Sequence, residues 1–282
     1  MLKLCRWGIA EYEVADLVGL PSAVVRTDDP REAHVVVVPS TRRVGPADVP
    51  LARLVITTTS GFDNLDVPAL RAAGVRCARL PLARRDPVVE TALGMMLSLT
   101  RRLGPFQEAA RADQWERKHL ARYDARLLGR VAVVGLGVIG TRVSAVLGAL
   151  GAQVVECPRG DALPIDIDVV TFHCSLTREN RGFANAEWLA RLPSHCVVVN
   201  TARGKLLDAD AAAVAVRAGQ LGGLGVDVFP EEPTSLARFA HPKIVVTPHA
   251  AGWHPGLGHA IAEGVATAVR ALLDGQPVPW SL

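Results

Sequence analysis

The chain has 282 residues, which at about 150 residues per domain predicts roughly two domains. Apolar residues make up 49% of the sequence and charged residues 21%, so a disordered, collagen-like or coiled-coil chain is excluded. The net charge of +3 comes from scattered arginines, and the densest stretch, 101–130, also contains acidic residues. We therefore expect a solvated helical face there and no nucleic-acid partner.

Neither a membrane segment nor a metal site is predicted. No apolar run approaches the roughly 20 residues of a membrane-spanning helix, and the N-terminal residues lack the apolar core of a signal peptide. The five cysteines form no CxxC pair and no cluster with histidine, which indicates buried thiols in a reducing compartment. We expect a cytoplasmic protein without membrane contact.

The first hundred residues alternate between strand-like and helix-like segments, which predicts a parallel sheet flanked by helices. Two helix-like segments, 10–18 and 67–73, lie among the strands, and a long helix is expected at 87–103. The expected strands are 2–7, 23–27, 34–39, 54–58 and 75–80.

A second alternating series begins at Arg130. Its near-continuous Val and Ile runs are typical of strands buried on both faces, as in doubly wound sheets. An amphipathic helix at 260–273 follows, and we expect it to return to the first domain through hinges at 87–103 and 253–262. The expected strands are 131–137, 153–157, 168–173, 195–200, 222–228 and 243–248, with helices at 140–150, 186–192 and 209–218.

A dinucleotide fingerprint, GLGVIG, follows the first strand of this second series and opens a helix. Gly135 permits a tight turn, Gly137 lets the backbone approach a pyrophosphate, and Gly140 allows close packing of helix on strand. The unpaired N–H groups of the helix N-terminus favour the phosphates. The choice between NAD and NADP stays open, because Glu156 or Cys157 could face the ribose while Arg159 could meet a 2′-phosphate.

Three further residues each lie just beyond an expected strand: Arg203 in NTARG, Glu232 in DVFPEEP and His249 in TPHAAG. Open α/β sheets bind their ligands at the carboxyl ends of the strands. Each residue taken singly is typical of a surface or turn position. Their equivalent placement downstream of one fingerprint favours a common site.

With these motifs, and with SGFDNLD at 60–66 and VVE at 88–90, the sequence resembles the D-isomer-specific 2-hydroxyacid dehydrogenase family over nearly its whole length. The resemblance implies an α/β fold in which a Rossmann doubly wound parallel sheet is inserted into a second, flavodoxin-like α/β substrate domain. We place the substrate domain at 1–97 plus 258–282 and the dinucleotide-binding domain at 98–257.

The resemblance also implies residue roles in hydride transfer between NAD or NADP and a small 2-keto or 2-hydroxy acid, expected in the reductive direction, by a homodimer. His249 would move the proton, and Glu232, rather than Glu231, would stabilise the protonated imidazole and fix its tautomer. Arg203 would hold the substrate carboxylate. The cofactor contacts expected besides the three glycines and residues 156, 157 and 159 are Val138, Ile139, Cys174, Thr201, Ala202 and Asp227.

The substrate loop departs from the family pattern. Ser60 and Gly61 are expected to bind the substrate carboxylate in a loop with less glycine than usual. Arg84 and Arg85 suggest a second anionic group on the substrate, a phosphate, phosphonate or carboxylate, unless they point to solvent. Two alternatives remain open: a cofactor-sensing binding protein without significant turnover, and an enzyme that oxidises a small inorganic or one-carbon anion.

Overall fold

The computed structural model describes residues 1–9, 19–115, 128–158 and 166–282. It divides into two compact units, one formed by Met1–Asp86 with Trp253–Leu282 and the other by Pro87–Gly252. The expected helix at 10–18 and the predicted cofactor residue Arg159 lie outside the described residues.

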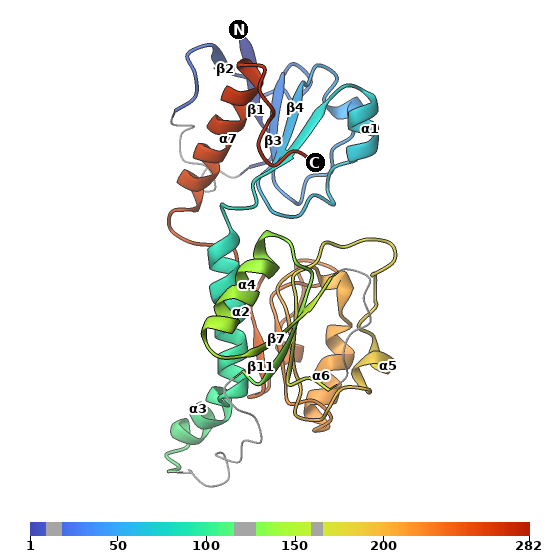
Figure 1. The fold of residues 1–282 in the computed structure, drawn as a ribbon, viewed down its shortest axis with the longest axis vertical. Helices are drawn as coiled ribbons and strands as arrows, with labels where there is room; N and C mark the ends of the chain where they lie inside the picture. The colour runs from blue at the N-terminus through green and yellow to red at the C-terminus, as the bar shows by residue number, and fades with distance from the viewer. Residues whose placement is uncertain (10–18, 116–127, 159–165) are drawn as a thin grey trace. The chain divides into compact units, whose positions relative to one another are not determined.

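The first unit is built on a five-stranded parallel sheet with the order β2-β1-β3-β4-β5. Helix α7 (Leu257–Leu273) lies along one face of this sheet, and α1 (Val67–Ala72) belongs to the other (Figure 1). The strands are β1 (Leu2–Arg6), β2 (Val24–Arg26), β3 (Val35–Val38), β4 (Leu54–Thr57) and β5 (Arg76–Arg79).

Alternation along β3 explains how this sheet is covered on both sides. Val35 and Val37 pack with α7 residues such as Ile261 and Val265, whereas Val36 and Val38 pack in a second cluster that contains Leu70 of α1. All four valines of β3 are fully buried, because successive strand side chains point to opposite faces and both faces carry helices.

The second unit has a six-stranded parallel sheet with the order β11-β10-β9-β8-β6-β7. Helices α2 (Arg85–Thr100) and α4 (Val138–Ala149) cover one face, and α5 (Ala186–Leu189) and α6 (Ala209–Arg217) cover the other (Figure 1). The chain passes from β6 to β7 on one side and then places β8 on the other side of β6, which creates the switch point where open α/β sheets bind ligands.

The bounds in this unit follow the predicted segments closely, and the expected α/β fold with a Rossmann-type doubly wound sheet is confirmed. The strands are β6 (Arg130–Val134), β7 (Gln153–Cys157), β8 (Val169–Phe172), β9 (Val197–Asn200), β10 (Gly223–Val226) and β11 (Ile244–Val246). The helices are α2 (Arg85–Thr100), α3 (Leu103–Arg111), α4 (Val138–Ala149), α5 (Ala186–Leu189) and α6 (Ala209–Arg217).

Two details differ from the expectation. The helix predicted at 87–103 ends at Thr100, because Arg102 adopts a left-handed backbone with φ of 55°, and a separate helix, α3, begins at Leu103. The predicted domain boundaries, after residue 97 and before residue 258, would also cut through α2 and α7. The buried residues of each helix instead pack in a single core. Met95 and Met96 of α2 pack with β6, and Ile261 of α7 packs with the first sheet.

Candidate active site

Three neighbouring strands of the second sheet end where the predicted catalytic residues begin. Arg203 follows β9, Glu232 follows β10 and His249 follows β11, and these strands are adjacent and parallel. Their carboxyl ends therefore lie at the same edge of the sheet. The chain brings together three side chains that are 46 residues apart in sequence from first to last.

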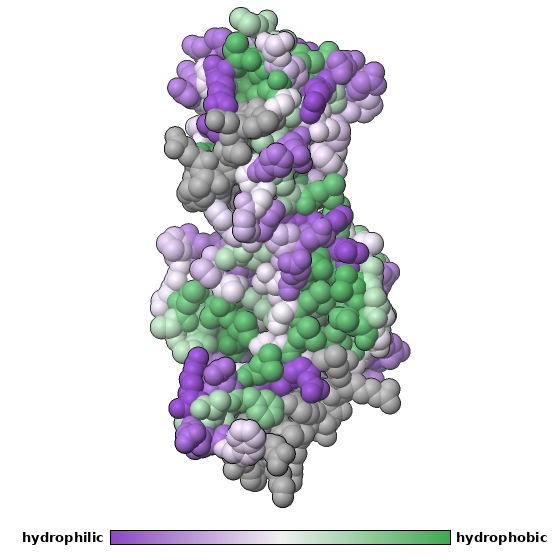
Figure 2. All heavy atoms as spheres, turned by 90° about the vertical axis from the view of Figure 1, so that its left-hand side faces the viewer, coloured by the Kyte–Doolittle hydropathy of each residue, from purple (hydrophilic) through white to green (hydrophobic). Residues whose placement is uncertain are grey.

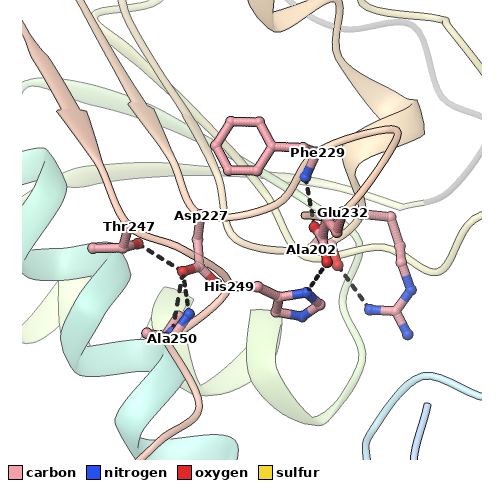
Figure 3. Close-up of polar contacts among 9 residues, drawn as sticks. Ala202, Asp227, Phe229, Glu232, Thr247, His249 and Ala250 are labelled. Atoms are coloured by element: carbon pink, nitrogen blue, oxygen red, sulfur yellow. Dashed lines mark hydrogen bonds and ion pairs between the residues drawn. The ribbon is translucent and has the colours of Figure 1, made fainter. Parts of the chain in front are cut away.

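Glu232 and His249 form a close pair (Figure 3). Glu232 Oε2 lies 2.6 Å from His249 Nδ1, and Oε1 accepts the Phe229 N–H at 2.7 Å. Burial by itself would raise the pKa of Glu232, but the hydrogen bonds from His249 and Phe229 and the charges of His249 and Arg203 outweigh it and lower this pKa below its ordinary value. Glu232 is thus held as a carboxylate that orients the imidazole through Nδ1.

The other imidazole nitrogen, Nε2, makes no hydrogen bond to any described residue, and 48% of the His249 side chain is exposed. An imidazole held at Nδ1 by a carboxylate, with Nε2 open, is the arrangement that general acid–base catalysis requires. His249 also adopts a φ of 54°, a left-handed conformation that is uncommon for a residue with a side chain.

The buried side chain of Asp227 holds His249 in this conformation (Figure 3). Asp227 Oδ1 accepts hydrogen bonds from the Thr247 hydroxyl at 2.6 Å and from the N–H groups of Ala250 at 2.8 Å and Ala251 at 3.1 Å. Its carbonyl accepts the His249 N–H at 2.8 Å. Asp227 therefore has a structural role that the sequence did not predict, while its Oδ2 makes no hydrogen bond within the described residues and stays available for the expected cofactor contact.

Arg203 is positioned by Asn200 at the end of its own strand, β9, and by a contact with Phe229 after the neighbouring strand, β10. The fully buried Asn200 accepts the Ala202 N–H and donates to the Arg203 carbonyl, which fixes the turn after β9. Gly204 packs directly on Phe229, where a Cβ would lie 2.0 Å from the Phe229 carbonyl carbon. This close approach brings Arg203 near enough to Glu232 for its charge to lower the Glu232 pKa.

Each of the three fingerprint positions is occupied by glycine for a different reason. Gly135 has a φ of 92°, and a Cβ there would meet Cys174 at 2.6 Å. A Cβ on Gly140 would lie 1.9 Å from the Gly135 carbonyl oxygen. Gly137, the residue that precedes α4, has no atom within 4 Å of a Cβ position, so protein packing does not require glycine there. Open space at the N-terminus of α4 fits the close approach of a pyrophosphate.

The remaining predicted cofactor residues lie around the same sheet edge. Val138 and Ile139 form the first turn of α4, and Cys174 lies behind Gly135 after β8. Thr201 is 8% exposed, and its hydroxyl is buried without a hydrogen-bond partner. A buried hydroxyl without a hydrogen-bond partner destabilises the folded protein. A cofactor group that forms a hydrogen bond with Thr201 Oγ1 would therefore stabilise both the protein and the bound cofactor. These residues fit a nicotinamide dinucleotide.

The structure separates the two candidates for the ribose. The Cys157 side chain is 3% exposed and packs in the core with Val134 and Phe172, whereas Glu156 is exposed. A ribose contact through the Cys157 side chain is therefore not supported by the structure, because strand alternation turns this side chain inward. The Cys157 carbonyl accepts the Gly135 N–H at 2.9 Å, which brings the end of β7 to the fingerprint.

In the first unit, the loop after β4 carries Ser60 and Gly61. The two arginines that follow β5, Arg84 and Arg85, have different surroundings. Arg85 makes two 2.8 Å hydrogen bonds to the Asp86 carboxylate, so its charge is matched within the chain. The Arg84 guanidinium lies 5.5 Å from the centre of the Trp253 ring, with a buried Nε.

His173 received no role from the sequence but lies behind the fingerprint. Its Nε2 lies 2.9 Å from the Thr171 hydroxyl, and a Cβ on Gly140 would lie 3.3 Å from its Cβ. Burial lowers the pKa of His173 to about 4. A strand ending in Thr-Phe-His places Thr171 and His173 on the same face, and this alternation is the signal that could have revealed the pair.

Comparison with known proteins agrees with this geometry. Residues 93–251 match the family model described as the NAD-binding domain of D-isomer-specific 2-hydroxyacid dehydrogenases. The chain belongs to this family. It is 33% identical over 258 residues to a D-3-phosphoglycerate dehydrogenase of Mycobacterium leprae, covering 83% of this chain and 47% of that protein. It is also 26% identical to a glycerate dehydrogenase of Methylorubrum extorquens, covering 81% of this chain and 78% of that protein.

The chain thus spans about half the length of the phosphoglycerate dehydrogenases that it matches. Among solved structures, the TT0316 protein from Thermus thermophilus superposes over 100% of both chains with a TM-score of 0.81 and 25% identity. A D-lactate dehydrogenase from Aquifex aeolicus, solved with NAD and lactic acid, shares the fold with a TM-score of 0.78 and 21% identity, covering 97% and 96% of the two chains.

A first prediction separates the roles of the glycines. Gly137→Ala should leave the melting temperature within about 2 °C of wild type and weaken NAD(H) or NADP(H) binding at least about tenfold, because a Cβ there meets cofactor rather than protein. Gly135→Ala, the matched control, should lower the melting temperature through its positive φ and its contact with Cys174. Calorimetric cofactor titration and thermal unfolding measure both, and normal cofactor affinity in Gly137→Ala contradicts the assignment.

A second prediction concerns pH and stability. The folded-state pKa of His173 lies below the ordinary 6.5, so between about pH 6.5 and 4 the unfolded chain binds a proton that the folded chain does not. This contribution to stability is fully present above pH 6.5 and decreases as the pH falls, by up to about 1.4 kcal/mol per pH unit. His173→Gln should show a shallower loss of stability in that window, whereas His259→Gln, which alters an exposed histidine, should follow wild type. Denaturant unfolding at each pH tests this, and parallel curves for wild type and His173→Gln contradict it.

Proposed function

We propose that the protein is an NAD(P)-dependent D-2-hydroxyacid dehydrogenase that reduces a small 2-keto acid to the D-2-hydroxy acid. The observation that carries the proposal is the His249–Glu232 pair, with Arg203 beside it, at the carboxyl edge of a sheet whose fingerprint fits a dinucleotide. Family membership supports it.

The residues of the second unit divide the chemistry among them. A bound NADH or NADPH would supply the hydride for C2 of the keto acid. Glu232 stabilises the protonated His249 imidazole through Nδ1, and His249 Nε2 then donates its proton to the C2 oxygen as this oxygen gains negative charge. Arg203 binds the carboxylate and polarises the C2 oxygen with its planar guanidinium. Asp227 holds the backbone of His249 in place.

The two cofactors remain alternatives. Glu156 is exposed at the end of β7 and is the acidic side chain that could accept the ribose hydroxyls, which favours NAD. The proposed homodimer has a candidate surface on the second unit, since Leu93 and Leu97 of α2 are only partly buried. Figure 2 shows hydrophobic residues gathered on the surface of this unit. Within the described residues no helix is long and apolar enough to cross a membrane, and we propose a cytoplasmic location.

The decisive experiment is a screen of 2-keto acids with NADH and NADPH, followed by variants of the pair. His249→Gln should lower kcat by about 10²- to 10⁴-fold and Glu232→Gln by about 10- to 100-fold, with cofactor affinity within about threefold of wild type. Glu231→Gln, the matched control at the neighbouring exposed acid, should retain wild-type turnover. Full activity in His249→Gln, or cofactor binding without turnover of any keto acid, would falsify the enzyme proposal, and the second result favours a cofactor-sensing binding protein.

We further propose that the substrate carries a second anionic group and that Arg84 binds it. Arg85 is already paired with Asp86, and the similarity to phosphoglycerate dehydrogenases favours a phosphate. Arg84→Ala should raise KM at least about tenfold more for a phosphorylated 2-keto acid than for glyoxylate, because a charge-assisted bidentate contact is lost only with the dianion. Arg85→Ala should change both KM values alike. Steady-state kinetics decide, and equal effects of Arg84→Ala on both substrates exclude this role.

A further inference from the structure

Arg79 ends β5 beside the loop that leaves β4. The two strands are parallel neighbours, and Thr57, the last residue of β4, is in register with Arg79. The loop that follows Thr57 therefore begins next to the Arg79 side chain. Arg79 is half-buried, and burial lowers the pKa of its guanidinium.

The guanidinium contacts this loop at two points. Arg79 Nη1 donates to the Ser60 carbonyl at 2.9 Å, and the guanidinium lies 5.7 Å from the centre of the Phe62 ring. Ser60 is held again from the same segment, because its hydroxyl donates to the Pro81 carbonyl at 3.2 Å. Within the described chain no carboxylate pairs with Arg79, so its charge is only partly compensated.

The bond to the Ser60 carbonyl sets the direction of an N–H group. In a trans peptide the C=O of one residue and the N–H of the next point in opposite directions. Holding the Ser60 carbonyl toward Arg79 therefore turns the Gly61 N–H away from it. The Gly61 carbonyl is held too, by the Thr59 hydroxyl at 2.9 Å, which orients the next peptide in the same way.

The same loop also contains backbone N–H groups that make no hydrogen bond to the described residues. The N–H groups of Thr59, Ser60 and Gly61 donate to no acceptor among the residues that the structure describes, although the loop is half-buried. Where a turn makes successive N–H groups converge, they form a binding site for an anion. A nearby arginine adds positive charge, which strengthens the attraction of such a site for a carboxylate.

We infer that Arg79 is a positioning residue for the substrate carboxylate. It holds the Ser60–Gly61 peptide so that the N–H groups of the loop bind the carboxylate, and its positive charge attracts the bound anion. The inference rests on the proposed function and deepens it. It assigns the orientation of the carboxylate-binding loop to a side chain on the neighbouring strand, 19 residues further along the chain.

The test compares Arg79→Ala, Arg79→Gln and Arg79→Lys with Arg76→Ala, which removes an exposed arginine from the other end of the same strand. Arg79→Ala and Arg79→Gln should raise the KM for glyoxylate and the inhibition constant of oxalate at saturating cofactor at least about tenfold. Their kcat should stay within about threefold, and their cofactor affinity should stay at the wild-type value. Arg79→Lys, which keeps the charge and a donor, should recover most of the loss, and Arg76→Ala should match wild type.

An unchanged KM and oxalate constant in a folded Arg79→Gln variant would overturn the inference while leaving the proposed function intact. An equal effect of Arg76→Ala would overturn it as well, because the effect would then be general to the strand. If the wild type reduces no keto acid, the proposed function fails, and calorimetric titration of oxalate into the cofactor-loaded protein replaces the kinetics. In that case, oxalate binding by wild type but not by Arg79→Gln supports Arg79, and equal or absent binding overturns its role.

Discussion

The hydrogen bonds of the buried Asp227 side chain are the contacts on which the proposed catalytic edge of the second sheet depends. Asp227 lies at the end of β10, its N–H donates to Asn200 of β9, and its side chain and carbonyl accept from the segment after β11. It therefore joins the ends of three strands at once. A buried carboxylate is tolerated only when hydrogen bonds compensate its lost hydration, and three donors to Oδ1 do so here. The strained φ of His249 persists because the residues on both sides of it are held.

This arrangement explains how a half-exposed pair can have a fixed geometry. Glu232 and His249 lie in loops, where side chains have more freedom than in a core. The backbone of His249 is held by Asp227, the carboxylate of Glu232 by the Phe229 N–H, and the turn at Arg203 by Asn200 and by the close contact of Gly204 with Phe229. Each of the three predicted catalytic residues is thus held by a contact that it makes itself or that its neighbour in sequence makes. In the first unit, Arg79 has the same relation to the Ser60–Gly61 loop.

The sequence predicted most of the fold because its signals are local. The Val-rich runs of β3 and β9 are buried on both faces, and the fingerprint glycines follow β6 as expected. Local signals fail where the backbone departs from a regular pattern without a marker residue. The break between α2 and α3 falls at an arginine with a left-handed backbone, which no glycine or proline indicates at that position. The inward turn of Cys157 and the ion pair of Arg85 with Asp86 likewise depend on which way side chains point, and the charge pattern alone does not contain this.

The sequence by itself determined the type of each element, the dinucleotide fingerprint and the residue types available for acid–base chemistry, because these depend on periodicity and on motifs within a few residues. Only the tertiary structure decided which of those residues lie together. Strand order brings Arg203, Glu232 and His249 to one edge of the second sheet. It also allows the Asp227 carbonyl to accept the His249 N–H, and it places Arg79 against Ser60. These contacts join residues on different strands, and strand order is a property of the whole sheet that no single segment specifies.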